Sequence, residues 1–494
     1  MSCLAGLNDK KAKVLCSLII AATTFIVMLF CAAFTSPLYP YYNGLDSSIF
    51  LTIAKGISEG KTMYVDLFDH KGPIFFWIES IGYVLKGRTG VWIIEYLFAL
   101  VDLFFLHKIC KELKSGFAIP ALVFSAIMLY TFSHGNITEE ICTPFVLISS
   151  YLSIKYFTSA RTSHPPIYGL IYGIFFAIIA FIRLNNSVII CGFVLCISIA
   201  LINNKEWKNL LHNGVAALTG IAIVTIPVCL YFNHIGALND MIYATFLYNF
   251  VYASGETHKA IFSSDILKYL VLYLPGIFSF IVFTKKSAEH QKLSKALAVI
   301  TIITYGLLIY ANVYEHYFVT GAPLPAIASA YVVQGRSLRE ICNKAFISKP
   351  LSILLIIVLF TNVLLAAYSA AAPFYKSFCA GEIKQEYLQV SNSLSIIPED
   401  EKNSVIGFGI FPVNYMYGDI TPCYKYYTLQ RWWTTDELNV YGEFIIFLKT
   451  EHPLWLITKC EETDSEILSI ISDNYDLITK DDYNCYYRYN GGNK

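Results

Sequence analysis

Charged residues are scarce in this sequence. Asp, Glu, Lys and Arg make up 15% of the 494 residues, whereas soluble domains carry about 25%. The charges also cancel, since Lys and Arg number 36 and Asp and Glu number 36. The low charge excludes an ordinary soluble domain, and the missing basic surplus excludes a nucleic-acid-binding protein. With 56% hydrophobic residues and a mean hydropathy of +0.53, the composition predicts a polytopic membrane protein.

Recognisable metal and redox motifs are also missing. The 13 cysteines form no Cys-x-x-Cys pair and show no zinc spacing, and the adjacent Asp69 and His70 alone are weak evidence for a divalent cation. The sequence therefore indicates no metal site and no particular cofactor, and it leaves a divalent cation open. The polar C-terminal part holds Cys379, Cys423, Cys460 and Cys485. An oxidising compartment would allow one or two disulfides among these four, and free thiols fit the sequence equally well.

Long apolar runs dominate the first 370 residues. A transmembrane helix needs about 20 apolar residues, and the runs that fit lie at residues 14–34, 90–107, 117–133, 139–157, 167–182, 187–202, 213–233, 266–284, 296–313, 317–334 and 350–370. The sequence thus predicts an all-α membrane bundle of about eleven transmembrane helices. The first run is long enough to span and has no convincing cleavage site after it, so we expect no cleaved signal peptide.

Lysine and arginine are concentrated in alternate loops. One side holds Lys10, Lys11 and Lys13; Lys108, Lys111 and Lys114; Lys155 and Arg161; Lys205 and Lys208; Lys285, Lys286, Lys292 and Lys295; and Arg336, Arg339, Lys344 and Lys349. The short loops on the other side, 134–138, 183–186 and 314–316, contain only Arg183. This positive-inside pattern predicts a cytoplasmic N-terminus and an extracytoplasmic C-terminus. The compact loops indicate a bacterial inner membrane.

The composition changes near residue 371. Residues 371–494 are polar and contain no further apolar run long enough to span a membrane. Short apolar runs at 404–411 and 453–458 predict buried strands, 464–475 predicts an amphipathic helix, and 485–490 predicts a closing strand. We therefore expect two domains: a transmembrane domain at 1–370 and a small extracytoplasmic α/β domain at 371–494.

The first outer loop, residues 35–89, has an unusual cluster of ionisable residues. Apolar residues at helical spacing predict a short helix after Asp46, capped by Ser47 or Ser48 and ended by Gly60. Pro73 then suits the start of a second short helix at about 74–86. Both helices are too short to span and fit the membrane surface. The linker between them carries Asp66, Asp69, His70 and Lys71. The simplest alternative is that these charges only keep the loop solvated.

Other ionisable residues fall on the same predicted face. Glu139 and Glu140 begin the fourth predicted span, where acidic residues also favour a helix N-terminus capped by Thr138. Arg183, Glu315 and His316 lie at two further outer turns, although single residues there are often structural. Cations beside lipid headgroups can stabilise a departing phosphate, and a carboxylate can take a proton from an incoming hydroxyl. The pattern indicates chemistry on a phosphate-bearing lipid.

Two stretches resemble a known family of membrane enzymes. An aspartate followed by a surface helix and then "FDHKGP" resembles the first outer loop of GT-C glycosyltransferases. The branch that is most similar contains the protein O-mannosyltransferase-like and aminoarabinose transferase-like enzymes. "YEHYFVTGAPLPAIASAY" at 314–331 resembles a late span of that branch, and the C-terminal outer domain fits it as well.

The resemblance implies transfer of a sugar from a polyprenyl-phosphate donor to an extracytoplasmic acceptor, with inversion of the anomeric carbon. It assigns Asp46 as the base on the acceptor hydroxyl and Lys71, with His70 beside it, to the donor phosphate. Glu139 or Glu140 matches a second acidic position of the family, which makes Glu139 a further catalytic candidate with Glu140 in support. The topology adds Arg183 and His316 as phosphate contacts, with Asp69 and Glu315 in support. The family's mannosyltransferases carry an acidic pair where this chain has "DSS", which leaves the acceptor open among lipid, cell-surface glycan and protein.

Two other functions fit a chain of this composition. A transporter or flippase of a lipid-linked saccharide would place ionisable residues near the middle of spans, and Asp102 lies near the middle of 90–107. A sensor with an outer domain would need no pairing of Asp46 with Lys71. The clustering of charge on one face favours the transferase.

Overall fold

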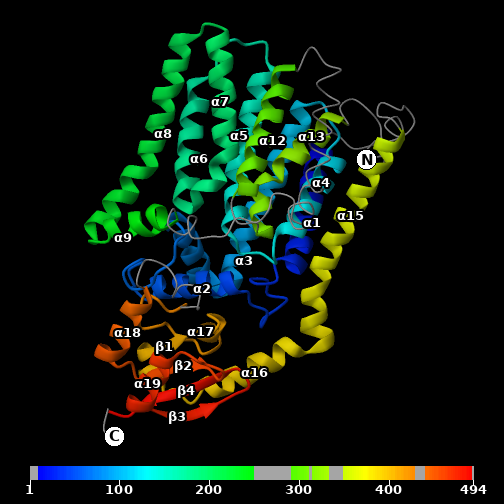
Figure 1. The fold of residues 1–494 in the computed structure, drawn as a ribbon. Helices are drawn as coiled ribbons and strands as arrows, with labels where there is room; N and C mark the ends of the chain where they lie inside the picture. Colours follow the sequence, from blue (N-terminus) through cyan, green and yellow to red (C-terminus); the bar gives the residue numbers. More distant parts are fainter. Residues whose placement is uncertain (1–8, 250–290, 311–313, 333–348, 429–439, 492–494) are drawn as a thin grey trace. The chain divides into compact units, whose positions relative to one another are not determined.

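The structure is a computed structural model that describes residues 9–249, 291–310, 314–332, 349–428 and 440–491 (Figure 1). The predicted span at 266–284 lies outside these residues, as do the loop residues Lys285, Lys286, Arg336, Arg339 and Lys344. The chain divides into two compact units. The first contains Met1–Ala32, Ile93–Tyr231 and Glu256–Ala372, and the second contains Ala33–Trp92, Phe232–Gly255 and Pro373–Lys494.

The first unit is helical. Its helices are α1 (Asp9–Cys31), the second part of α3 (Pro73–Glu112), α4 (Ala118–Thr131), α5 (Thr138–Thr158), α6 (Pro166–Arg183), α7 (Val188–Asn203), most of α8 (Trp207–His234), α12 (Gln291–Tyr310), α13 (Pro323–Val332) and most of α15 (Lys349–Phe374). The 3₁₀ helices η2 (Leu184–Ser187) and η4 (Glu315–Gly321) connect them. Helix α5 packs on α6, α7 and η4, and α13 packs on α4.

Small residues let α6 and α8 approach closely. A side chain added at Gly173 of α6 would collide with the backbone of Ala217 on α8, and one at Gly220 of α8 would collide with the backbone of α6. Close contact through small residues is typical of helix packing inside membranes, where the hydrophobic effect does not drive helices together.

Helices occupy the predicted spans that fall in the described residues, but the predicted number of eleven is not established. Among those residues, three helical stretches are long and apolar enough to cross a membrane: Pro73–Glu112, Pro166–Asn203 and Trp207–His234. Helix α4 has 14 residues, fewer than the roughly 20 that a bilayer requires.

The second unit holds the first outer loop together with the C-terminal part. Its elements are α2 (Leu45–Ser58), the first part of α3, α9 (Leu238–Ile242), the π-helices η3 (Tyr243–Leu247) and η5 (Tyr375–Ala380), α16 (Glu382–Leu394), η6 (Glu399–Ser404), β1 (Val405–Phe408), α17 (Val413–Tyr417), α18 (Val440–Glu451), β2 (Trp455–Lys459), α19 (Ser465–Asn474), β3 (Tyr475–Lys480) and β4 (Asn484–Tyr489). This grouping follows contacts, whereas the predicted boundary at residue 370 concerns the membrane and stays a prediction.

A four-stranded sheet forms the centre of the C-terminal part. The strand order is β1-β2-β4-β3, with β1 parallel to β2 and the other pairs antiparallel (Figure 1). The predicted strands correspond to β1, β2 and β4, and the predicted amphipathic helix is α19, which Asp464 caps through Glu466 N and Ile467 N. Cys379, Cys423, Cys460 and Cys485 are free thiols.

Helix α2 exists as predicted, but its N-terminus and surroundings differ from expectation. Gly44 is the N-cap residue, and Asp46 lies inside the first turn. Ser48 is not a cap, because its hydroxyl donates to the carbonyl of Gly44 at 2.6 Å. Most of α2 is buried, including Ser48 and Lys55. These buried polar residues show that protein covers α2 on more than one side. Its predicted position in the membrane surface stays a prediction.

The C-terminal part supplies much of this enclosure. Lys55 Nζ lies 2.5 Å from the Asp419 carboxylate, and the Tyr427 hydroxyl donates to the carbonyl of Ile49 at 3.2 Å. The hydrogen bond from Lys55 holds the pKa of Asp419 below its ordinary value. The buried lysine therefore has an ionised partner at neutral pH.

Helix α3 has a kink that lies a few residues before the boundary between the two units at Trp92 and Ile93. Lys86 and Gly87 have non-helical backbone angles, with φ of 55° at Gly87, a left-handed conformation that glycine adopts without strain. The predicted short helix at about 74–86 and the predicted span at 90–107 are the two sides of this kink.

Candidate functional site

Asp69, His70 and Lys71 form a compact cluster in the second unit. The Lys71 backbone N–H donates to Asp69 Oδ1 at 2.8 Å. The Lys71 Nζ lies 3.7 Å from the same carboxylate oxygen and 2.9 Å from His70 Nε2. Asp69 is 4% exposed and Lys71 is 8% exposed. The lysine is thus a buried cation that two neighbouring side chains hold in one orientation.

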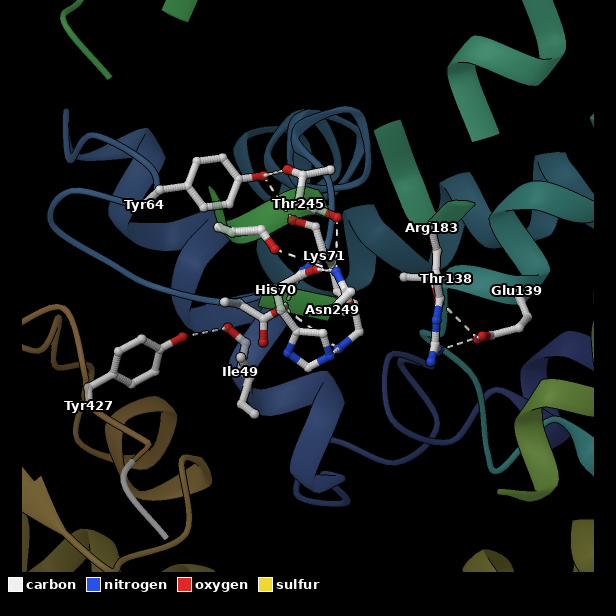
Figure 2. Close-up of polar contacts among 12 residues, drawn as sticks. Ile49, Tyr64, His70, Lys71, Thr138, Glu139, Arg183, Thr245, Asn249 and Tyr427 are labelled. Atoms are coloured by element: carbon white, nitrogen blue, oxygen red, sulfur yellow. Dashed lines mark hydrogen bonds and ion pairs between the residues drawn. The ribbon is translucent and has the colours of Figure 1, made fainter. Parts of the chain in front are cut away.

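Three residues that the sequence did not indicate fix the backbone of this cluster (Figure 2). The Tyr64 hydroxyl donates to the carbonyl of Lys71 at 2.8 Å, and the Asn249 amide donates to the carbonyl of His70 at 2.9 Å. Thr245 donates to the Tyr64 hydroxyl at 3.4 Å. Burial raises the pKa of Tyr64 well above its ordinary value, so its hydroxyl stays protonated and keeps donating.

Helix α2 carries both Asp46 and Phe50, and the Phe50 ring lies near Lys71. The Lys71 ammonium lies 5.6 Å from the centroid of the Phe50 ring, within the range of a cation–π contact. Asp46 and Phe50 are four residues apart on α2, and residues at this spacing share one face of a helix. Asp46 is half-buried in the first turn. The face of α2 that Lys71 covers is therefore the face that carries Asp46.

Arg88 holds the segment that leads into Asp46. Its guanidinium donates to five backbone carbonyls of that segment: those of Ala33, Phe34, Tyr39, Pro40 and Tyr42. Four of these bonds measure 2.6 to 2.7 Å. An arginine offers five N–H donors in a rigid planar group, which suits a loop whose carbonyls converge on one point.

Replacing Arg88 by lysine is expected to destabilise this segment by about 2–3 kcal/mol, because an ammonium cannot reproduce the planar donor set and hydrogen bonds to charged groups contribute about 1.5–3 kcal/mol. Thermal unfolding of the detergent-solubilised protein measures the effect. Arg161→Lys, at an exposed position, is the matched control. An Arg88→Lys variant with the wild-type Tm would show that the five bonds do not stabilise the fold.

A second cluster lies in the first unit, around Glu139 (Figure 2). Glu139 is 1% exposed. Its Oε1 accepts a bond of 2.8 Å from Arg183 Nη1, and its Oε2 accepts one of 3.0 Å from the Thr138 hydroxyl. The Arg183 guanidinium lies 4.2 Å from the centroid of the Tyr317 ring. His316, next along η4, interacts electrostatically with Glu139, so the predicted Glu139, Arg183 and His316 do come together.

Polar contacts hold the three elements of this cluster in register. The Thr320 hydroxyl of η4 donates to Asn186 Oδ1 in η2 at 2.8 Å, and the Asn186 amide contacts the Cys142 sulfur of α5 at 3.5 Å. All three residues are buried. Helix α5 carries Glu139, η4 carries His316, and η2 directly follows Arg183, the last residue of α6. The network therefore holds the two partners of the ion pair in place.

Removing Glu139 is expected to be strongly destabilising. Glu139→Leu leaves the nearly buried Arg183 without its carboxylate, and breaking a buried ion pair by removing one partner costs about 3–5 kcal/mol. The measurement is the Tm of the solubilised protein. Adding Arg183→Met to the first change should restore much of the loss, since replacing both charges removes the uncompensated one. A single variant as stable as wild type would contradict the buried ion pair.

Glu140 and Glu315 are the remaining predicted residues. Glu140, 5% exposed, lines a cavity with Glu95 and Asp102 in the first unit, and Glu315 is exposed at the start of η4. Among the described residues, no three of His, Cys, Asp and Glu are grouped so that they could hold a metal ion. Asp69, His70 and Lys71 belong to the second unit, and Glu139, Arg183 and His316 belong to the first.

The fold is shared with two solved structures. Both are of ArnT from Cupriavidus metallidurans, one bound to undecaprenyl phosphate with a TM-score of 0.62 and one in the apo state with a TM-score of 0.61. Each is 12% identical, and each alignment covers 95% of this chain and 97% of the other. Together with its apolar helices, this likeness defines the chain as an integral membrane protein with a GT-C, aminoarabinose transferase-like fold.

The sequence also matches a family model over most of its length. The model described as "Putative competence-induced protein Ccs4 N-terminal domain" matches residues 8–340, and the chain belongs to this family. No curated protein matches the sequence.

Proposed function

We propose that this chain is a membrane glycosyltransferase that moves a sugar from a polyprenyl-phosphate donor to an extracytoplasmic acceptor. The proposal is based on the buried Lys71 ammonium, which lies beside the face of α2 on which Asp46 is found. The fold supports it, because a solved structure with the same fold is bound to undecaprenyl phosphate. The protein would act in the bacterial inner membrane, with the second unit's C-terminal part outside the cytoplasm.

Lys71 would bind the donor phosphate. Its ammonium can make charge-assisted hydrogen bonds to phosphate oxygens, and burial strengthens them by excluding water. The phosphate gains negative charge as the sugar departs, so the same contacts would stabilise the transition state more than the ground state. His70 and Asp69 would hold the ammonium in place, so that no reorganisation is needed when the bond breaks.

Asp46 would be the general base. Its carboxylate would take the proton of the acceptor hydroxyl while that oxygen attacks the anomeric carbon, and the bond from that carbon to the phosphate oxygen would break. The electron pair of the broken bond stays on the departing polyprenyl phosphate. A single displacement of this kind inverts the anomeric carbon. The segment held by Arg88 would keep Asp46 positioned for the reaction.

Glu139 fits a positioning role better than a catalytic one. Both of its carboxylate oxygens accept hydrogen bonds, one from Arg183 and one from Thr138. A base engaged in this way is poorly placed to take a proton. We therefore assign it to orienting Arg183 within the first unit.

Turnover by the reconstituted protein tests the proposal. The protein in vesicles is given undecaprenyl-phosphate sugars labelled in the sugar, with a bacterial membrane extract as a source of acceptors. A transferase releases undecaprenyl phosphate and moves the label to an acceptor. Movement of the intact donor across the vesicle membrane without cleavage would instead indicate the flippase, and neither result with any donor would reject both.

A further inference from the structure

Asp102 is a buried acid that the proposed reaction does not use. It lies on α3 beyond the kink, within the first unit, and is 3% exposed. Among the described residues, its Oδ1 atom has no hydrogen-bond partner. Ionisable side chains inside membrane spans are costly and usually face a functional cavity. We therefore expect Asp102 to bind either a proton or a ligand.

Asp102 lines a cavity of about 100 Å³. Residues of helices α1, α3, α4 and α5 line it, and its walls are mostly hydrocarbon, with Phe98, Leu103, Phe124 and Met128 among the lining residues. Two further acids, Glu95 and Glu140, also line it. Glu95 accepts a 2.6 Å bond from the backbone N–H of Asn136, so its carboxylate is already engaged by the protein.

The apolar walls of the cavity and the carboxylate of Asp102 together indicate the chemical class of the ligand. An unpaired carboxylate in an apolar cavity is unstable, and it either takes up a proton or binds a cation. A bare metal ion needs several ligands at once, and the described residues hold no suitable group of three. Hydrocarbon walls favour an apolar body instead. A molecule with one ammonium group and a small apolar body satisfies both the carboxylate and the walls.

We infer that this cavity is a binding site for a small apolar amine, with the ammonium on Asp102 and the hydrocarbon against Phe98, Phe124 and Met128. The size is suitable, since a dry cavity of about 150 Å³ binds benzene and this one suits a ligand of about five heavy atoms. The site is separate from the Asp46 and Lys71 machinery. It does not depend on the proposed transferase activity.

Three probes of one shape test the inference: isobutylamine, isobutanol and isopentane. Binding to the full-length protein in lipid nanodiscs is measured by ligand-observed NMR titration. The amine should bind at least about tenfold more tightly than the alcohol, because a hydrogen bond to a charged group contributes about 1.5–3 kcal/mol. Equal binding of all three probes, or no binding of the amine, would overturn the inference.

Variants show where the amine binds. Asp102→Asn keeps the shape and should weaken isobutylamine about tenfold while leaving isopentane within about twofold. Met128→Trp should fill the cavity and abolish binding of both, with Asp102 still present. Glu112→Gln removes a carboxylate elsewhere on α3, where Glu112 accepts from Thr158, and should leave binding unchanged. Amine binding that Asp102→Asn leaves unchanged, or that is still detected in Met128→Trp, contradicts the site.

Discussion

Replacing Lys71 by methionine should lower kcat/KM for the lipid-linked donor by about 10² to 10³-fold, the usual loss when one preorganised donor to a developing anion is removed. Part of the loss should appear as a higher KM for the donor, because the phosphate carries charge before the reaction begins. The rest should appear in kcat, because the charge on the phosphate rises as the sugar departs.

Methionine is the informative substitution at this position. It keeps an apolar chain against Phe50, and the backbone N–H at position 71 can still bond to Asp69. Lys384→Met, at an exposed position of α16 in the same unit, is the matched control and should leave kinetics unchanged. A Lys71→Met enzyme with wild-type KM and kcat would remove the lysine from the donor site.

Replacing Asp46 by asparagine should lower kcat by about 10² to 10⁴-fold, the usual contribution of a positioned general base. Asparagine keeps the size and polarity of the side chain but cannot take the acceptor's proton. Donor binding does not need that proton transfer, so the KM for the donor should stay within a few-fold of wild type. The two constants are measured together from initial rates.

Glu382→Gln offers a close control for Asp46. Glu382 is also an acid in the first turn of a helix of the second unit, and it is exposed. Both changes remove the same favourable interaction of an acid with a helix N-terminus. A loss shared by the two variants would therefore reflect helix stability, and a normal turnover number in Asp46→Asn would rule out its role as the base.

Local patterns predicted the elements near the site well. Apolar residues at helical spacing gave α2 and the first part of α3, and the Gly-Pro pair marked the start of α3 at Pro73. Short apolar runs gave β1, β2 and β4. Strand β3 was missed because its burial pattern is mostly exposed, so it lacks the apolar run or alternation that identifies a strand.

Contacts between distant segments could not be predicted from the sequence. Asn249 and His70 are 179 positions apart, and Thr245 and Tyr64 are 181 positions apart. Nothing in the local sequence of either partner indicates the other. The prediction that a serine caps α2 was wrong for a related reason. The Ser48 hydroxyl donates to the carbonyl of Gly44 and does not cap the helix. Which of these two hydrogen bonds a serine makes depends on the backbone of the preceding loop.

The second cluster was predicted in part. Positive-inside topology placed Glu139, Arg183 and His316 on one face of the membrane, and the structure brings them together in the first unit. The sequence could not show that Arg183 and Thr138 would take up both oxygens of Glu139. That detail depends on side-chain orientation, and it changes the proposed role of Glu139 from a catalytic residue to a positioning residue.

A structure of the protein with a bound polyprenyl-phosphate sugar, determined by cryo-electron microscopy in lipid nanodiscs, would show whether Lys71 and Asp46 form the donor site. We expect the donor phosphate within hydrogen-bond distance of Lys71 Nζ, with the anomeric carbon turned toward the Asp46 carboxylate. A phosphate bound away from Lys71, or an anomeric carbon that Asp46 and an acceptor hydroxyl cannot reach together, would contradict it.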